Sequence, residues 1–326
     1  MDHNNLQRFY KGKKALVTGG LGFIGINIIK RLIGLGAEIT AVDNFVSPEL
    51  KKLLASVYSQ LNIVVADIRD EDKVERVVKE QDIIFNMAGK SGAADSNKTP
   101  MNDLDVNCRG HLTVLEACRR YNPRVTIIFP SSRLVYGKPR YLPVDEVHPL
   151  APDSIYAVHK LTVENYHFIY SKLYGLKTTV LRISNPYGPM QIESARPYGI
   201  ANKFIQSAVR GEQITIFGEG AQRRDYLYID DLVQAFLMAG FKQEASGKVY
   251  NIGNVQTVSL LDLAHLAIEA AGGGAIVKVP WPVEYDAIET GDYQSNIDLA
   301  AKELEWSPAT ALKAGIIKTV EFYRHY

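Results

Sequence analysis

Cysteine is scarce in this 326-residue sequence, which contains only Cys108 and Cys118. Their spacing matches neither a metal-binding motif nor the disulfide framework of a small secreted protein, so we expect inert core or interface thiols in a reducing compartment. The sequence also lacks any run of 18 or more apolar residues, and its polar start lacks the apolar stretch of a signal peptide. We therefore expect a soluble, cytoplasmic protein.

An excess of charge of either sign is also missing. The 37 Lys and Arg residues nearly balance the 36 Asp and Glu residues, and the formal net charge is +1. Proteins that bind nucleic acids or anionic membranes carry basic patches or blocks, which this sequence does not show. The composition therefore argues against nucleic-acid and membrane partners and favours a small-molecule ligand.

The first half of the chain alternates short apolar segments with amphipathic helical patterns. This alternation predicts an α/β fold with a Rossmann-type, doubly wound parallel sheet. The expected strands are 14–19, 38–43, 62–67, 82–89 and 124–132, and the expected helices are 23–35, 73–80, 102–121 and 156–174. Near residue 180 the pattern changes to mixed short segments with Pro, Gly and aromatic turns. We predict a dinucleotide-binding domain at 1–180 and a smaller mixed α/β substrate lobe at 181–326, and leave open whether later segments return to the first domain.

A glycine-rich segment lies between the first expected strand and helix. Gly19, Gly22 and Gly25 follow a G-x-x-G-x-x-G spacing, which allows a tight turn and close approach of the backbone to a pyrophosphate. Asp43 ends the next strand, where a carboxylate binds the ribose hydroxyls of adenosine and repels a 2′-phosphate. This combination predicts NAD rather than NADP. Asp67 ends the third strand, where it either reaches the adenine or starts a helix.

Three polar residues suggest the chemistry. Ser132 ends a strand, and Tyr156 and Lys160 are four residues apart on a helical pattern, so they share one helix face. Use of the Tyr156 phenolate as a base at neutral pH requires its pKa to fall by roughly three units, about 4 kcal/mol. A neighbouring ammonium and the positive nicotinamide ring both favour the phenolate, and Ser132 can share the substrate hydroxyl's hydrogen bond.

Six motifs together resemble one family. The sequence is similar to the extended short-chain dehydrogenase/reductases that act on nucleotide sugars, the UDP-galactose 4-epimerase-like group. The resemblance runs from about residue 13 to residue 326. It is carried by "TGGLGFIG" (18–25), "NMAG" (86–89), "PSSRLVYG" (130–137), "YAVHK" (156–160), "RISNPYGP" (182–189) and "RRDYLYIDD" (223–231).

The resemblance implies roles for individual residues. Ser132, Tyr156 and Lys160 would be catalytic, with Lys160 also holding the nicotinamide ribose, and Asn107 would brace the active-site helix. It further implies a nucleotide-sugar substrate, with Asn185 and Arg224 contacting the diphosphate. The expected cofactor-binding positions are Gly19, Gly22, Phe23, Ile24, Asp43, Asn44, Asp67, Ile68, Ala88, Gly89, Lys90, Tyr156 and Lys160. It also implies a homodimer formed by the helices 102–121 and 156–174, for which Leu112, Leu115, Tyr166 and Tyr170 would suit the interface, unless they belong to the core of one chain.

The chain departs from the family at Arg133 and Leu134. Relatives that dehydrate the hexose carry an Asp–Glu pair there, and relatives that decarboxylate a uronic acid carry a glutamate in the same turn. Neither Arg133 nor Leu134 can remove the C5 proton, so we predict C4 epimerisation of a UDP-hexose or UDP-uronic acid through a 4-keto intermediate. The alternatives are a 4-ketoreductase or dehydratase-like enzyme of the same family and a non-catalytic NAD-sensing protein.

Two further positions leave the substrate open. Arg133 either pairs with a sugar carboxylate, which would make it a substrate-binding residue, or forms a salt bridge with Asp145 or Glu146. Glu289 stands where many relatives place a diphosphate-binding arginine, so Arg223 or Arg196 would have to assist Arg224 in binding the diphosphate. The nucleotide base is not predicted.

Overall fold

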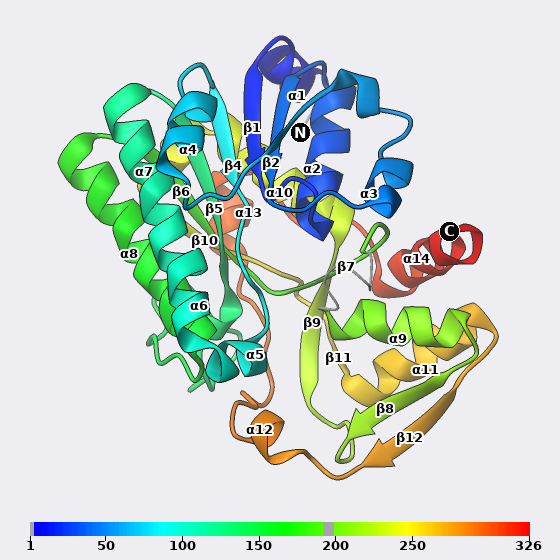
Figure 1. The fold of residues 1–326 in the computed structure, drawn as a ribbon. Helices are drawn as coiled ribbons and strands as arrows, with labels where there is room; N and C mark the ends of the chain where they lie inside the picture. Colours follow the sequence, from blue (N-terminus) through cyan, green and yellow to red (C-terminus); the bar gives the residue numbers. More distant parts are fainter. Residues whose placement is uncertain (1–2, 192–198) are drawn as a thin grey trace.

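A parallel seven-stranded sheet forms the centre of the computed structural model, which describes residues 3–191 and 199–326 (Figure 1). The strand order is β10-β6-β5-β4-β1-β2-β3, and every neighbouring pair is parallel. The strands are β1 (Lys14–Thr18), β2 (Glu38–Asp43), β3 (Leu61–Val65), β4 (Ile83–Asn86), β5 (Thr126–Ser132), β6 (Lys177–Ile183) and β10 (Val249–Ile252). Strands β1, β4 and β5 are almost wholly buried, as expected for parallel strands covered on both faces.

Helices cover both faces of this sheet. On one face, α4 (Glu71–Val78), α7 (Gly110–Tyr121) and α8 (Ile155–Tyr174) pack around Leu16, Ile84 and Ile127 (Figure 1). On the other face, α1 (His3–Tyr10), α2 (Phe23–Gly34) and α10 (Ile229–Phe241) pack around Val17 and Phe85. Because successive strand residues point to opposite faces, alternate apolar side chains supply the two cores. The predicted Rossmann-type, doubly wound fold is confirmed.

The smaller lobe follows β6 and faces the carboxyl ends of the strands. It contains a three-stranded sheet, β11-β9-β7, and a two-stranded sheet, β12-β8. Its elements are β7 (Asn185–Tyr187), α9 (Ile200–Val209), β8 (Gln213–Phe217), β9 (Arg223–Tyr228), β11 (Thr257–Ser259), α11 (Leu260–Ala271), β12 (Ala275–Val279) and α14 (Leu312–His325). Helices α9, α11 and α14 pack against one another (Figure 1). The lobe is therefore mixed α/β.

The chain crosses between the two parts more than once. Residue 180 lies inside β6, and β10 returns to pair with β6 at the edge of the large sheet. Helix α10 also returns and packs against α2. The remaining helical segments are α3 (Pro48–Leu53), η1 (Tyr58–Gln60), α5 (Ala93–Lys98), α6 (Pro100–Leu104), η2 (Asp105–Arg109), η3 (Arg133–Tyr136), η4 (Gln243–Ala245), α12 (Val283–Asp286) and α13 (Asp298–Glu303). Within 3–191 and 199–326, no helix is both long and apolar enough to cross a membrane.

Candidate active site

The turn between β1 and α2 has the geometry of a phosphate cradle. Gly19 has a φ of +60°, and a Cβ there would lie 2.7 Å from the Ala88 Cα atom. A Cβ at Gly25 would lie 2.5 Å from the Gly19 carbonyl oxygen, so the turn closes only with glycine at both positions. Gly22 caps α2 without a side-chain hydrogen bond, which leaves backbone N–H groups for an anion. Phe23 and Ile24 begin α2 and line the same cavity. The residues present therefore fit the pyrophosphate of a dinucleotide.

Acidic residues lie at the ends of the next two strands. Asp43 is buried, and its carboxylate accepts hydrogen bonds from the backbone N–H groups of Leu21 at 3.1 Å and Phe45 at 3.3 Å. Asp67 accepts hydrogen bonds from the Arg69 guanidinium at 2.8 Å and from the Asn44 amide at 3.4 Å. Arg69 holds the pKa of Asp67 down, at about 2. Both carboxylates line a cavity of about 330 Å³, together with Asn44, Ile68 and Lys90.

Asp67 does not start a helix. Helix α4 begins at Glu71, and Asp70 is its N-cap, accepting a hydrogen bond from the Lys73 N–H at 3.2 Å. The helix-start alternative for Asp67 is therefore wrong.

The segment after β4 is clamped by Asn107. The Asn107 side chain accepts a hydrogen bond from the Lys90 N–H at 3.0 Å and donates one to the Lys90 carbonyl oxygen at 3.1 Å. A Cβ at Gly89 would lie 2.8 Å from the Asn107 oxygen, so glycine permits this clamp. Asn107 also donates to Asp103, whose carboxylate contacts His159 on α8 at 2.7 Å. Asn107 thus ties the expected cofactor segment to the helix that carries Tyr156.

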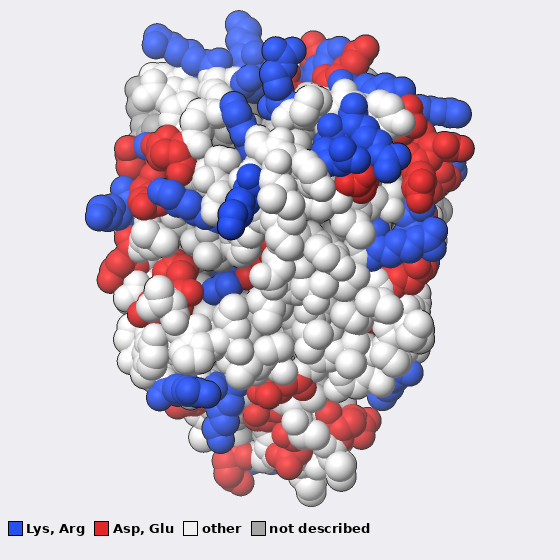
Figure 2. All heavy atoms as spheres, turned by 90° about the vertical axis from the view of Figure 1, so that its left-hand side faces the viewer, with Lys and Arg blue, Asp and Glu red and all other residues white. Residues whose placement is uncertain are grey.

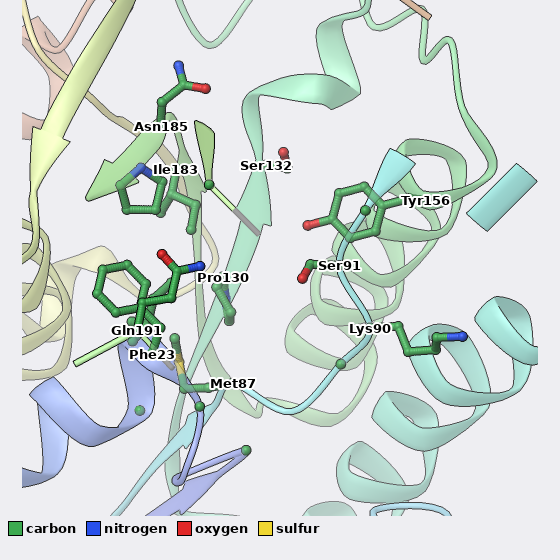
Figure 3. Close-up of a pocket in the computed structure, with 18 of the residues that line it drawn as sticks. Phe23, Met87, Lys90, Ser91, Pro130, Ser132, Tyr156, Ile183, Asn185 and Gln191 are labelled. Carbon is green, nitrogen blue, oxygen red and sulfur yellow. The ribbon is translucent and has the colours of Figure 1, made fainter. Parts of the chain in front are cut away.

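Ser132, Tyr156 and Lys160 meet at the carboxyl end of β5. The side chains of Ser132 and Tyr156 line the same cavity, and Figure 3 shows the Tyr156 hydroxyl pointing into it. Ser154 caps the start of α8, and Ser96 accepts a hydrogen bond from the Tyr156 N–H at 2.9 Å, which fixes the first turn. The Lys160 ammonium donates to the Pro130 carbonyl oxygen at 2.8 Å.

Burial perturbs both titratable groups of this trio. Burial and the charge of Asp103 raise the pKa of the Tyr156 hydroxyl, while the neighbouring Ser132 hydroxyl acts in the opposite direction. Burial lowers the pKa of Lys160 to about 8. At pH 7 about nine tenths of Lys160 is therefore still charged. The residues of the chain do not by themselves lower the pKa of Tyr156 as base catalysis requires.

Ser131 points away from the catalytic trio. Its hydroxyl donates a hydrogen bond to Glu164, which lies one turn after Lys160 on α8. Glu164 pairs with Arg182 on β6, with contacts of 3.0 and 2.7 Å, and both side chains are buried. Both serines that end β5 line the cavity, and the Ser131 hydroxyl also anchors the strand to α8.

Arg133 does not form the salt bridge considered from the sequence. Asp145 accepts a hydrogen bond from Tyr141, and Glu146 accepts one from the Asn251 N–H. The Arg133 guanidinium instead donates to Asn185 at 3.4 Å and to Thr290 at 3.2 Å, and it lies 5.0 Å from the centre of the Tyr293 ring. Arg133 thus faces the cavity.

Arg224 lies on β9 and forms an ion pair with Glu289. Glu289 also accepts a hydrogen bond from the Gly291 N–H at 2.8 Å, so the acid that departs from the family pattern is fixed in place. Arg223 donates to Thr257 at 3.2 Å and to the Thr257 carbonyl oxygen at 2.7 Å. Arg196 lies outside the described residues. Next to Arg224, Asp225 is fully buried and accepts hydrogen bonds from the N–H groups of Asn254 and Ser295.

One cavity of about 460 Å³ joins these features. It contains the glycine-rich turn, the catalytic trio and the wall formed by Arg133 and Asn185. Figure 3 shows Phe23 and Met87 at one end, with Ser132 and Asn185 toward the other. Within the part of the chain that the structure describes, no group of three or more His, Cys, Asp or Glu residues is placed to hold a metal ion.

Sequence reasoning missed several residues of this site. Ser96 and Asn97 cap the first turn of α8 from 60 and 58 residues away in the chain. Thr290 and Tyr293 reach Arg133 from more than 150 residues away. No local pattern marks any of them, because their positions depend on loops that only the tertiary fold brings together.

Comparisons with known proteins agree with this geometry. The model of the NAD dependent epimerase/dehydratase family matches residues 15–253. A putative UDP-glucose 4-epimerase of Methanocaldococcus jannaschii is 33% identical over 316 residues, which cover 95% of this chain and 98% of that protein. A Thermotoga maritima UDP-glucose 4-epimerase structure with UDP-glucose is 31% identical, with a TM-score of 0.86, and covers 96% of this chain and 99% of its own.

A third similar structure contains both a cofactor and a nucleotide sugar. It is the UDP-glucuronic acid 4-epimerase from Bacillus cereus in complex with UDP-glucuronic acid and NAD. It is 26% identical, with a TM-score of 0.85, and covers 96% of this chain and 99% of its own. Because the family model spans most of the sequence and the relatives match nearly end to end, the chain belongs to the NAD dependent epimerase/dehydratase family.

Proposed function

We propose that this protein is an NAD-dependent nucleotide-sugar epimerase that inverts the configuration at C4 through a 4-keto sugar. The observation that carries the proposal is the placement of Ser132, Tyr156 and Lys160 in one cavity with the glycine-rich turn. The named relatives and structures that match from end to end include UDP-sugar 4-epimerases, which supports the same reaction.

Each residue of the trio has a defined task in this reaction. Tyr156 removes the proton of the sugar's 4-hydroxyl, and Ser132 holds that hydroxyl in line by sharing its hydrogen bond. A positive charge on Lys160 favours the phenolate over the neutral phenol. NAD, when bound, supplies the hydride acceptor and donor at C4 and a second positive charge beside Tyr156. Gly19, Gly22, Asp43 and Asp67 would hold this cofactor.

The turn after Ser132 argues against other reactions of the same family. Elimination of water or loss of a carboxyl group requires an acid or base near C5. Arg133 and Leu134 occupy the first two positions after Ser132, and neither can serve as a base at neutral pH. Oxidation at C4 followed by return of the hydride to the opposite face needs no further base.

The experiment is an incubation of purified protein, without added cofactor, with UDP-, dTDP-, GDP- and CDP-linked hexoses and uronic acids. Proton NMR of the anomeric and H4 signals follows the reaction. We expect two C4 epimers to interconvert with no net formation of NADH. A 4-ketoreductase would instead change the cofactor stoichiometrically, and an NAD-sensing protein would convert no sugar.

We also infer that the protein is a homodimer. Of the four residues that the resemblance suggested for the interface, Leu115 and Tyr170 are buried in the core of one chain, whereas Leu112 and Tyr166 are partly exposed. Other large apolar side chains on α6 and α8 are exposed, including Met101 at 72%, Leu173 at 64% and Ile169 at 48%. Figure 2 views the side of the molecule that carries α7 and α8, and a broad area without charged side chains occupies its centre. A second copy of this chain is the proposed occupant.

Sedimentation of matched variants tests the dimer. Leu173→Glu places a charge on this face and is expected to give monomers. Val283→Glu places the same charge at another exposed site, on α12, and is expected to leave the dimer intact. A monomeric wild-type protein would contradict the inference.

The buried, free thiols Cys108 and Cys118 support a reducing, cytoplasmic location for this enzyme.

A further inference from the structure

Arg133 is a positive side chain in the wall of the cavity with only neutral partners. Its guanidinium donates to the Asn185 amide oxygen and the Thr290 hydroxyl and lies over the ring of Tyr293. Within 3–191 and 199–326, no carboxylate lies within ion-pair distance of it. A charge that is partly removed from water without an opposite charge lowers stability unless a ligand supplies that charge.

The neighbouring arginine differs in this respect. Arg224 is paired with Glu289, so its charge is already balanced within the protein. Loss of water around Arg133 and the charge of Arg224 lower the pKa of Arg133 to about 10, while the more distant Asp225 and Glu289 act in the opposite direction. Arg133 therefore stays charged at neutral pH, and of these two arginines it is the one without an ion-pair partner among the described residues.

We propose that Arg133 selects the substrate by binding a carboxylate on the hexose, so that the preferred substrates are nucleotide-linked uronic acids. This inference rests on the proposed C4 epimerisation and specifies its substrate class. A planar guanidinium can donate two parallel hydrogen bonds to a carboxylate, whereas a neutral 6-hydroxymethyl group offers a single oxygen.

The position of Arg133 favours the sugar carboxylate over the diphosphate. Ser132 is assigned to the 4-hydroxyl, and Arg133 is the next residue, with its Cα atom about 3.8 Å away. In a pyranose ring the C6 carboxylate is attached to C5, next to C4, while the diphosphate is attached to C1 at the opposite end.

The test compares UDP-glucuronate with UDP-glucose in wild-type protein and in matched variants. Arg133→Gln removes the charge and keeps a polar side chain. Arg133→Lys keeps the charge and loses the planar guanidinium that can donate two parallel hydrogen bonds. Arg140→Gln is the control, because Arg140 is an exposed arginine nearby in the chain, and its backbone N–H donates a hydrogen bond to His148. For each protein, kcat/KM is measured with both sugars, along with bound NAD and thermal unfolding.

We expect wild type to prefer UDP-glucuronate. Arg133→Gln should lower kcat/KM for UDP-glucuronate at least about 30-fold, as expected when one partner of a desolvated charge pair is truncated. The same variant should change kcat/KM for UDP-glucose less than threefold. Arg133→Lys should restore part of the preference, and Arg140→Gln should match wild type.

Three results would overturn the inference. In the first, wild type epimerises UDP-glucose but does not prefer UDP-glucuronate. This result would contradict the role of Arg133 and leave the proposed C4 epimerisation intact, and it needs no variant to fold. In the second, Arg133→Gln lowers kcat/KM by the same factor for both sugars, which would assign Arg133 to the diphosphate that the two substrates share. In the third, wild type epimerises neither these sugars nor any other nucleotide sugar, in which case the proposed function itself fails.

Discussion

The ammonium of Lys160 lies 5.8 Å from the centre of the Tyr156 ring, one helical turn along α8. A hydrogen bond to the Pro130 carbonyl oxygen holds it there. The helix thus places a positive charge beside a phenol that lines the same cavity as Ser132. This relationship underlies the assignment of Tyr156 as the group that moves the proton.

Tyr156→Phe is therefore expected to abolish turnover while preserving the fold. General acid–base catalysis by one positioned side chain contributes about 10²- to 10⁴-fold, so we expect kcat to fall at least about 100-fold. Bound NAD and the midpoint of thermal unfolding should stay near those of wild type. Tyr174→Phe, an exposed position on the same helix, serves as the control. Retention of more than a tenth of the activity by Tyr156→Phe would exclude Tyr156 as the base.

Asp43 should determine the choice between NAD and NADP. Its carboxylate is fixed by the N–H groups of Leu21 and Phe45, where it would meet the adenosine ribose. Asp43→Asn keeps the shape and removes the negative charge that repels a 2′-phosphate. We expect the preference for NAD to fall about tenfold, or about 1.4 kcal/mol, in calorimetric titrations of cofactor-free protein. An unchanged preference would place the ribose elsewhere.

The buried pair of Glu164 and Arg182 should contribute to stability, unlike exposed pairs. Glu164→Gln leaves the Arg182 charge buried without its partner, so we expect the free energy of unfolding to fall by about 3 kcal/mol. Glu75→Gln removes half of an exposed pair with Lys79 on α4 and should cost less than about 1 kcal/mol. Urea unfolding at pH 7 measures both. Equal losses in the free energy of unfolding for the two variants would show that the buried pair stabilises the protein no more than the exposed pair.

The two thiols should be unreactive in the native protein. Burial disfavours the thiolate, raising the pKa of Cys108 to about 11 and the pKa of Cys118 further. At pH 8 about one Cys108 side chain in a thousand is thus ionised, and the fraction rises with pH. Ellman's reagent should therefore label no thiol quickly at pH 8 and two thiols after unfolding in guanidinium. Rapid labelling of a native thiol at pH 8 would contradict this.

The sequence predicted those parts of the site that depend on local spacing. The glycines of the first turn, Asp43 and the Tyr156–Lys160 pair follow from the order of strands and helices, which fixes the sheet edge where they meet. The partners of Arg133 could not be predicted, because Thr290 and Tyr293 approach it through a loop with no regular pattern. The effect of burial on the Tyr156 pKa also depends on packing that no motif records.

The fate of the hydrogen at C4 tests the central claim most directly. UDP-glucose and UDP-glucuronate carrying deuterium at C4 would be incubated with purified protein in ordinary water, without added cofactor, and the products examined by NMR and mass spectrometry. We predict that the C4 epimer forms with its deuterium still at C4 and that no NADH appears in solution. Loss of the label to water, or epimerisation at another carbon, would contradict hydride transfer at C4 and with it the proposed function.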